Sequence, residues 1–198
     1  MRKIGALSFP VFLFCVVAQA QIPTGGNVFF GYSYSRGNTF TSSFAPPPIP
    51  ANGSVGMNGW EASLEGKYLP WIGVVVDFDW HYGSRSVTPV CVTPGCTNRP
   101  PFDLNASRHE LMFGPRASVS VGRYTPFAQF LLGVAHQTDT GGGSSNSDTT
   151  PAIAIGGGLD YKLIKGVAWR VQLDSIHTYF FGNGQNDIRF STGILFRF

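Results

Sequence analysis

Charged side chains are scarce in this sequence. Asp, Glu, Lys and Arg together make up 13% of its 198 residues, whereas an average globular domain has about a quarter. No run of 18 or more apolar residues follows the N-terminal segment, so the sequence predicts no membrane-spanning helix. Glycine and proline are plentiful, with 25 and 14 residues, which disfavours long helices and suits strands joined by turns.

The first twenty residues have the pattern of a secretory signal peptide. Arg2 and Lys3 precede a short apolar stretch, and a small-x-small cleavage site ends at Ala20. We therefore expect residues 1–20 to be removed and residues 21–198 to form one domain. The formal net charge of that domain is 3 − 2 = +1, which gives no electrostatic reason to expect binding to nucleic acid.

Two cysteines remain after this cleavage, and they flank a Pro-Gly turn in the segment CVTPGC. In an exported protein this arrangement predicts a local disulfide between Cys91 and Cys96. A metal pair is the alternative, but the segment contains no histidine and no third cysteine. We expect no metal and no cofactor, because the four histidines are scattered without ligand spacing: His81, His109, His136 and His177.

Apolar and polar residues alternate along most of the remaining chain, which is the period of a β-strand with two unlike faces. Alternation is clear in five segments: 60–68, 74–83, 110–122, 167–175 and 188–198. Three further segments, richer in glycine, complete the set: 27–38, 126–139 and 151–164. Eight strands of about ten residues or more are long enough to cross a bilayer when tilted. We expect an all-β fold, an eight-stranded antiparallel up-and-down barrel.

The expected connections alternate between long and short. The long links are residues 39–58, 87–106 and the polar stretch 140–150, and the link at 182–186 is moderate. Tight turns are expected at 69–71, 122–124 and 165–166. Long and short links therefore fall at opposite ends of the barrel, as in membrane barrels with short periplasmic turns and long extracellular loops.

Alternation alone does not show which face points inward, and a soluble lipocalin-like barrel would enclose the apolar face. The positions of the large aromatic residues favour a membrane barrel, because they gather near both ends of the strands. One group lies by the tight turns: Tyr68, Trp71, Tyr124, Tyr161 and Trp169. The other lies by the long loops: Trp60, Trp80, Tyr82 and Tyr179. We therefore expect membrane lipid to surround the apolar face.

The C-terminal octapeptide STGILFRF is apolar to its last residue. It resembles the recognition signal of bacterial outer-membrane barrels in four residues: Ser191, Gly193, Phe196 and Phe198. From about residue 27 the chain resembles the eight-stranded OmpA-like transmembrane barrel family, most clearly in PFAQFLLGVAHQ, GGGLDYKL and DIRFSTGILFRF. The resemblance implies location in a bacterial outer membrane and recognition of the last strand by the barrel-assembly machinery. Many members carry a peptidoglycan-binding domain after the barrel, and we expect that tether to be absent here.

With the apolar face in lipid, the charged residues of the strands face the lumen. An eight-stranded barrel is just wide enough for side chains, and buried charges are costly unless each finds a partner. We therefore expect a polar, plugged lumen with a charge network formed by Glu65, Lys67, Asp77, Asp79, Glu110, Arg116, Arg170, Asp174 and Arg189. Further charges share this face: Glu61, Asp160, Lys162 and Arg197.

Several functions are compatible with such a barrel. A structural and surface-presentation role is expected, and a small pore or a surface adhesin is the alternative. Discrete openings in planar bilayers would favour the pore, and host binding lost on trimming residues 87–106 would favour the adhesin. A lipid-acting enzyme using Ser175 and His177 is least favoured, because no acid completes a triad with them. We expect no enzyme, and the sequence names no extracellular ligand.

Overall fold

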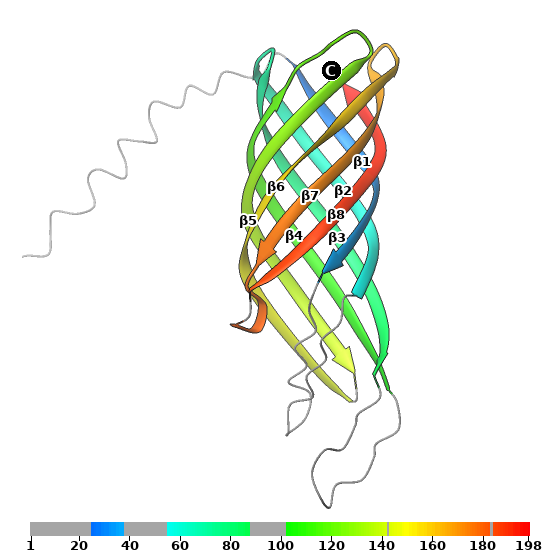
Figure 1. Cartoon of the computed structure of the whole chain (residues 1–198), viewed down its shortest axis with the longest axis vertical. Helices are drawn as coiled ribbons and strands as arrows, with labels where there is room; N and C mark the ends of the chain where they lie inside the picture. Colours follow the sequence, from blue (N-terminus) through cyan, green and yellow to red (C-terminus); the bar gives the residue numbers. More distant parts are fainter. Residues whose placement is uncertain (1–24, 38–54, 88–101, 142, 183) are drawn as a thin grey trace, which may run out of the picture.

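In the computed structural model, the described part of the chain comprises residues 25–37, 55–87, 102–141, 143–182 and 184–198. These residues form one closed barrel in which each strand pairs antiparallel with its neighbours in sequence (Figure 1). The strands are β1 (Gly25–Gly37), β2 (Val55–Leu69), β3 (Ile72–Val87), β4 (Phe102–Ser118), β5 (Tyr124–Gly141), β6 (Ser144–Ile164), β7 (Val167–Thr178) and β8 (Gln185–Arg197). A short 3-10 helix, η1 (Phe180–Gly182), precedes β8. The expected eight-stranded up-and-down barrel is confirmed.

The barrel closes where the first strand meets the last. β1 pairs with β8 over eleven positions, from Asn27 opposite Arg197 to Gly37 opposite Asp187. The backbone groups of Gly26 and Phe198 extend this seam with two hydrogen bonds of 3.0 and 3.1 Å. Closure leaves no unpaired sheet edge along the seam, which is what a strand in hydrocarbon requires because lipid offers no hydrogen-bond partners.

The three expected tight turns lie at the same end of the barrel as the C-terminus (Figure 1). They join β2 to β3 at residues 70–71, β4 to β5 at 122–123 and β6 to β7 at 165–166. Gly122 and Gly166 adopt φ values of +62° and +80°, in the left-handed region that glycine reaches without a steric penalty. These turns are confirmed.

The opposite end differs from the expectation, because strands extend into all three of the long segments expected to be loops. The stretch 140–150 was expected to be a loop, but β5 and β6 pair through it as far as Gly141 opposite Ser144. Residues 55–58 belong to β2, and residues 102–106 belong to β4. The alternation of apolar and polar residues does not reveal these strand ends, because a strand outside the membrane needs no apolar face. The ends of β3, β4, β5 and β6 therefore project beyond the last β6–β7 pair, Ala152 with Thr178. We call these projecting strand ends the raised wall.

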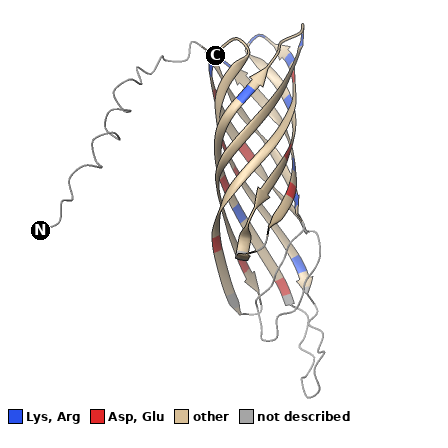
Figure 2. Ribbon diagram, turned by 60° about the vertical axis from the view of Figure 1, so that its left-hand side comes forward, with Lys and Arg blue, Asp and Glu red and all other residues tan. Residues whose placement is uncertain are grey.

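The polarity of the barrel is the reverse of that of a soluble protein. Large apolar side chains on the strands, such as Phe30, Phe113 and Ile155, are exposed on the outer face. Charged and polar side chains, such as Glu61, Asp77 and Arg189, are buried inside. Among the described residues, no helix is long and apolar enough to cross a membrane. Both signs of charge occur along the strands, amid long uncharged stretches (Figure 2).

Candidate functional site

The enclosed polar lumen is the candidate site. Alternation places every second side chain of each strand inside the barrel, and in the described residues nine carboxyl groups and four guanidinium groups are buried there. The acidic residues are Glu61, Glu65, Asp77, Asp79, Glu110, Asp139, Asp160, Asp174 and Asp187. The basic residues are Arg108, Arg116, Arg170 and Arg189. Acid therefore outnumbers base inside.

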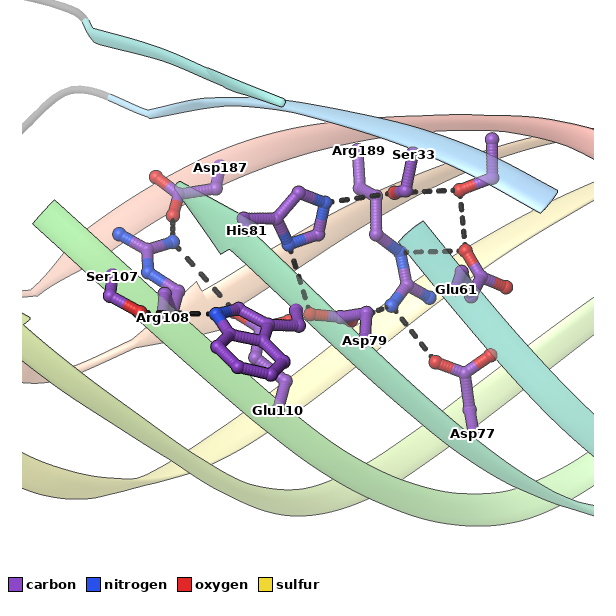
Figure 3. A network of polar contacts seen from close by, with 12 residues as sticks. Ser33, Glu61, Asp77, Asp79, His81, Ser107, Arg108, Glu110, Asp187 and Arg189 are labelled. Atoms are coloured by element: carbon purple, nitrogen blue, oxygen red, sulfur yellow. Dashed lines mark hydrogen bonds and ion pairs between the residues drawn. The ribbon is translucent and has the colours of Figure 1, made fainter. Parts of the chain in front are cut away.

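Arg189 of β8 lies at the middle of this lumen and contacts four carboxyl groups. Three of these, Glu61, Asp77 and Asp79, are labelled in Figure 3. Its Nη1 donates to Asp77 Oδ1 at 2.9 Å and also contacts Asp79 of the same strand. Its Nη2 donates to Asp174 Oδ2 at 2.8 Å, and its Nε lies 3.6 Å from Glu61 Oε2. One side chain therefore ties β8 to β2, β3 and β7 across the interior.

Neutral side chains hold the same carboxyl groups from the other direction. Gln172 Nε2 donates to Glu61 Oε1 at 3.0 Å and to Asp174 Oδ2 at 2.7 Å. Gln129 Nε2 donates to Asp174 Oδ1 at 2.8 Å, and Ser191 Oγ donates to Glu61. Apart from the bond between Gln172 and Asp174 within β7, each of these bonds joins two strands, so together they fix the carboxyl groups in the centre of the barrel.

A second group of charges lies toward the raised end. Arg108 contacts Asp187 and donates to Gln137 Oε1 at 3.1 and 2.9 Å, and its guanidinium lies 5.2 Å from the Phe180 ring centre. His81 belongs to the central group. Its Nδ1 lies 3.0 Å from Asp79 Oδ1, and its Nε2 lies 2.8 Å from a β1 serine hydroxyl. Asp79 lies opposite Glu110, whose Oε1 is 3.7 Å from Arg108 Nη1, so the second group adjoins the central one.

A third group lies toward the tight turns and is built around an aromatic ring. The guanidinium groups of Arg116 and Arg170 lie 4.5 and 4.4 Å from the ring centre of Phe127. Arg170 donates to Asp160 at 2.7 and 3.0 Å, and Arg116 lies 3.3 Å from Glu65. Stacking on Phe127 lets two like charges approach without direct contact, because each binds the ring face as a cation.

The structure places all nine residues of the expected lumen network on the inner face. Eight are buried, and Lys67 is 24% exposed at the rim, 3.9 Å from Glu65. Arg197 is similar, with 30% exposure and a 3.4 Å contact to Asp160. Lys162, also expected inside, is exposed, because it lies two residues beyond Asp160 where β6 reaches its turn.

Sequence reasoning missed several members of the network. Arg108 and Asp187 were not included, although each lies two residues before an included one, on the same face of its strand. The glutamines were missed because an uncharged side chain does not mark the inner face. One wall of the lumen is also apolar, which the charge pattern did not predict; it includes Val75, Met112, Leu131, Ala135, Ala152, Ala154 and Ile176.

The residues of the expected assembly signal take different places in β8. Ser191 lies in the lumen, 3.0 Å from a β1 serine. Gly193 faces Gly31 across the closing seam, and Phe196 and Phe198 are exposed on the outer face. Recognition by the assembly machinery stays a prediction. The expected signal peptide and the Cys91–Cys96 disulfide lie outside the described residues.

The two residues of the lipid-acting enzyme alternative lie on the outer face. Ser175 and His177 both point outward from β7 and are exposed. His177 Nδ1 lies 2.8 Å from Asn186 Oδ1. The partner of this histidine is therefore an amide, whereas a catalytic triad has a carboxylate in that position. Among the described side chains, no hydrogen bond joins Ser175 to His177, so the two do not form a nucleophile–base pair in this arrangement.

The comparisons with known proteins bear on the fold. No family model matches this sequence, and no curated protein matches it. Among solved structures, the chain is similar to Ail, the attachment invasion locus protein of Yersinia pestis. Identity is 16%, 88% of this chain and 98% of that chain are covered, and the TM-score is 0.54. Neisserial surface protein A is similar at 13% identity, with 87% and 97% covered and a TM-score of 0.56.

The chain has the fold of the bacterial outer-membrane β-barrels. This outer-membrane barrel is also similar to the Escherichia coli outer membrane protease OmpT, at 7% identity, with 89% and 97% covered and a TM-score of 0.50. Since one of these structures is a protease, the fold by itself does not decide whether a barrel is an enzyme. The fold and the apolar outer face together indicate the bacterial outer membrane as the location of the barrel.

Proposed function

We propose that this outer-membrane barrel is a non-enzymatic envelope component with a plugged lumen, and that its raised wall presents polar groups at the cell surface. The observation that carries the proposal is Arg189, whose guanidinium meets carboxyl groups from β2, β3 and β7. A side chain held by carboxyl groups of three other strands crosses the middle of the lumen, and this supports a plugged interior.

The apolar wall supports the plugged lumen from the other side. Met112, Leu131 and Ile176 are buried next to one another on β4, β5 and β7. A water-filled channel would wet these side chains, which is unfavourable by roughly 25 cal/mol for each Å² of apolar surface. Opening the channel would also separate Arg189 from its carboxyl groups, and breaking a buried pair costs about 3–5 kcal/mol.

Surface adhesion is the second candidate, and the raised wall favours it. β3 and β4 pair as far as Val87 opposite Phe102, and β5 and β6 pair through a run of Ser, Thr and Asn. Rigid strands that project beyond the membrane suit recognition by the loops they carry. Attachment is named for Ail, and sucrose octasulfate, a heparin analogue, has been bound to that protein. The occupied lumen, by contrast, does not favour a pore.

Planar-bilayer recording tests the plugged lumen. We expect the purified, refolded barrel to give no discrete openings at neutral pH, because the Arg189 contacts persist in the membrane. A general porin in the same bilayers serves as the positive control. The Asp103→Asn variant, changed at an exposed strand end outside the lumen, should be equally silent. Regular openings in the wild-type barrel would contradict the plugged lumen and support the small pore.

A further inference from the structure

The lumen holds more negative than positive groups. Nine buried carboxyl groups face four buried guanidinium groups in the described residues, and Lys67 and Arg197 at the rim raise the positive groups to 4 + 2 = 6. If every carboxyl were ionised and His81 were neutral, 9 − 6 = 3 negative charges would have no counter-charge. Each uncompensated buried ion costs several kcal/mol, so the enclosed network is not stable in that state.

Four of these carboxyl groups form two neighbouring pairs in the lumen. Asp79 of β3 lies directly opposite Glu110 of β4, and Glu61 of β2 and Asp77 of β3 contact the same guanidinium, that of Arg189. An ionised carboxylate is only an acceptor, so two of them cannot form a hydrogen bond. The proximity becomes favourable when one carboxyl of the pair carries a proton and donates it, as in carboxyl pairs that share a proton.

Several buried atoms of the lumen have no hydrogen-bond partner, and both acceptors and donors are among them. Asp77 Oδ2, Glu110 Oε2 and Gln172 Oε1 have no hydrogen-bond partner, and each belongs to a residue with at most 1% exposure. All three are acceptors, and two belong to the carboxyl pairs. Buried acceptors without donors are rare in folded proteins.

The neighbouring charges do not supply these donors. The Glu61–Asp77 pair faces Arg189 and Asp174, and Arg189 is shared by four carboxyl groups. The Asp79–Glu110 pair faces Arg108, His81 and Arg189. Arg108 is itself shared with Asp187 and faces Asp139 of β5. One guanidinium among several carboxyl groups leaves each pair short of positive charge.

We propose that the lumen is a proton-binding site, in which Glu61 with Asp77 and Glu110 with Asp79 each hold one proton between their carboxyl groups while the barrel is folded at neutral pH. Two bound protons reduce the ionised carboxyl groups to 9 − 2 = 7, against six positive groups. The network then approaches neutrality, and each pair gains an internal hydrogen bond. The protons are ligands of the folded state, because the same side chains ionise freely in the unfolded chain at that pH.

Infrared spectroscopy of the refolded barrel in lipid vesicles tests the proposal. A protonated carboxyl has a C=O stretch distinct from that of a carboxylate, and deuterium exchange shifts it. At pH 7.5 we expect this band in the folded wild type and its loss on unfolding. Glu61→Gln should lose half of the band, and Asp77→Asn serves as a second variant for the same pair. Asp103→Asn, outside the lumen, should keep the whole band.

The pH dependence of stability gives a second readout. The folded state binds more protons than the unfolded state, so stability is highest in mild acid and falls as the pH rises. The temperature at which the folded gel band disappears should fall from pH 7 to pH 10 in the wild type, and should fall less in Glu61→Gln. A folded wild type with no protonated-carboxyl band at pH 7.5 would overturn the proposal. So would a band that Glu61→Gln and Asp77→Asn both leave at full size.

Discussion

Replacing Arg189 with methionine is expected to abolish folding of the barrel at neutral pH. Methionine has a similar length but no charge, so the change leaves Glu61, Asp77, Asp79 and Asp174 in one buried space without the guanidinium that contacts all four. Removing one partner of a single buried ion pair costs about 3–5 kcal/mol. Here one substitution removes the partner of four groups, and a typical domain is stable by only about 5–15 kcal/mol.

Heat modification on denaturing gels measures this effect, because a folded membrane barrel migrates differently before and after boiling. The Arg189→Met variant should show only the unfolded band after refolding into vesicles, whereas Arg123→Met, at an exposed turn, should fold as the wild type does. Adding Asp77→Asn and Asp79→Asn to Arg189→Met should restore part of the folded band by removing two of the stranded charges. Full folding of the single variant would show that the network does not hold the barrel together.

A methyl group at Gly193 is expected to prevent the seam between β1 and β8 from closing. Gly193 lies opposite Gly31, and a Cβ atom built there would lie 2.3 Å from the Gly31 Cα and 2.3 Å from the Phe30 carbonyl oxygen. Both are backbone atoms of the partner strand, so no side-chain rotation relieves the overlap. We expect Gly193→Ala to lower stability by about 3 kcal/mol, the upper end of the usual penalty for overpacking.

The matched control is the same change at Gly184, before β8, where the nearest heavy atom to an added Cβ is 3.6 Å away. Gly184→Ala should refold into lipid vesicles as well as the wild type, and Gly193→Ala should give a much smaller folded fraction. Refolding in vesicles contains no assembly machinery, so a defect there isolates closure of the seam from recognition of the last strand. Equal folded fractions for the two variants would argue against a close backbone approach at this seam.

The fold of this chain was predictable because apolar and polar residues alternate along its strands, and this period of two is visible in a single sequence. In any strand, Asp77 and Asp79 lie on one face and Phe78 and Trp80 on the other, whichever strands pair with it. The structure shows this arrangement. The raised wall was not predictable, because its Ser- and Asn-rich strands have two polar faces and resemble a loop. In that region the strands are extended by pairing between their backbones, and the order of side chains in the sequence does not reveal this pairing.

The partners within the lumen were harder to predict than its lining. Sequence period places Arg189 inside, but its four carboxyl contacts depend on the register of three other strands and on the closure of β8 against β1. Val75 shows the same limit. It lies in a run of three valines, and only its cross-strand surroundings, with Met112 and Leu131 nearby in the apolar wall, show why an apolar side chain is stable inside.

The central claim is that the apolar face of every strand contacts lipid. Spin labels on single cysteines at Val76, Leu111 and Phe190 test it in a Cys91→Ser, Cys96→Ser background of residues 21–198 refolded into vesicles. We predict high accessibility to oxygen, which concentrates in lipid, and low accessibility to a water-soluble nickel complex. A label at Asp103 should show the reverse. Low accessibility to both reagents at the first three positions would place them in a packed centre and contradict the account.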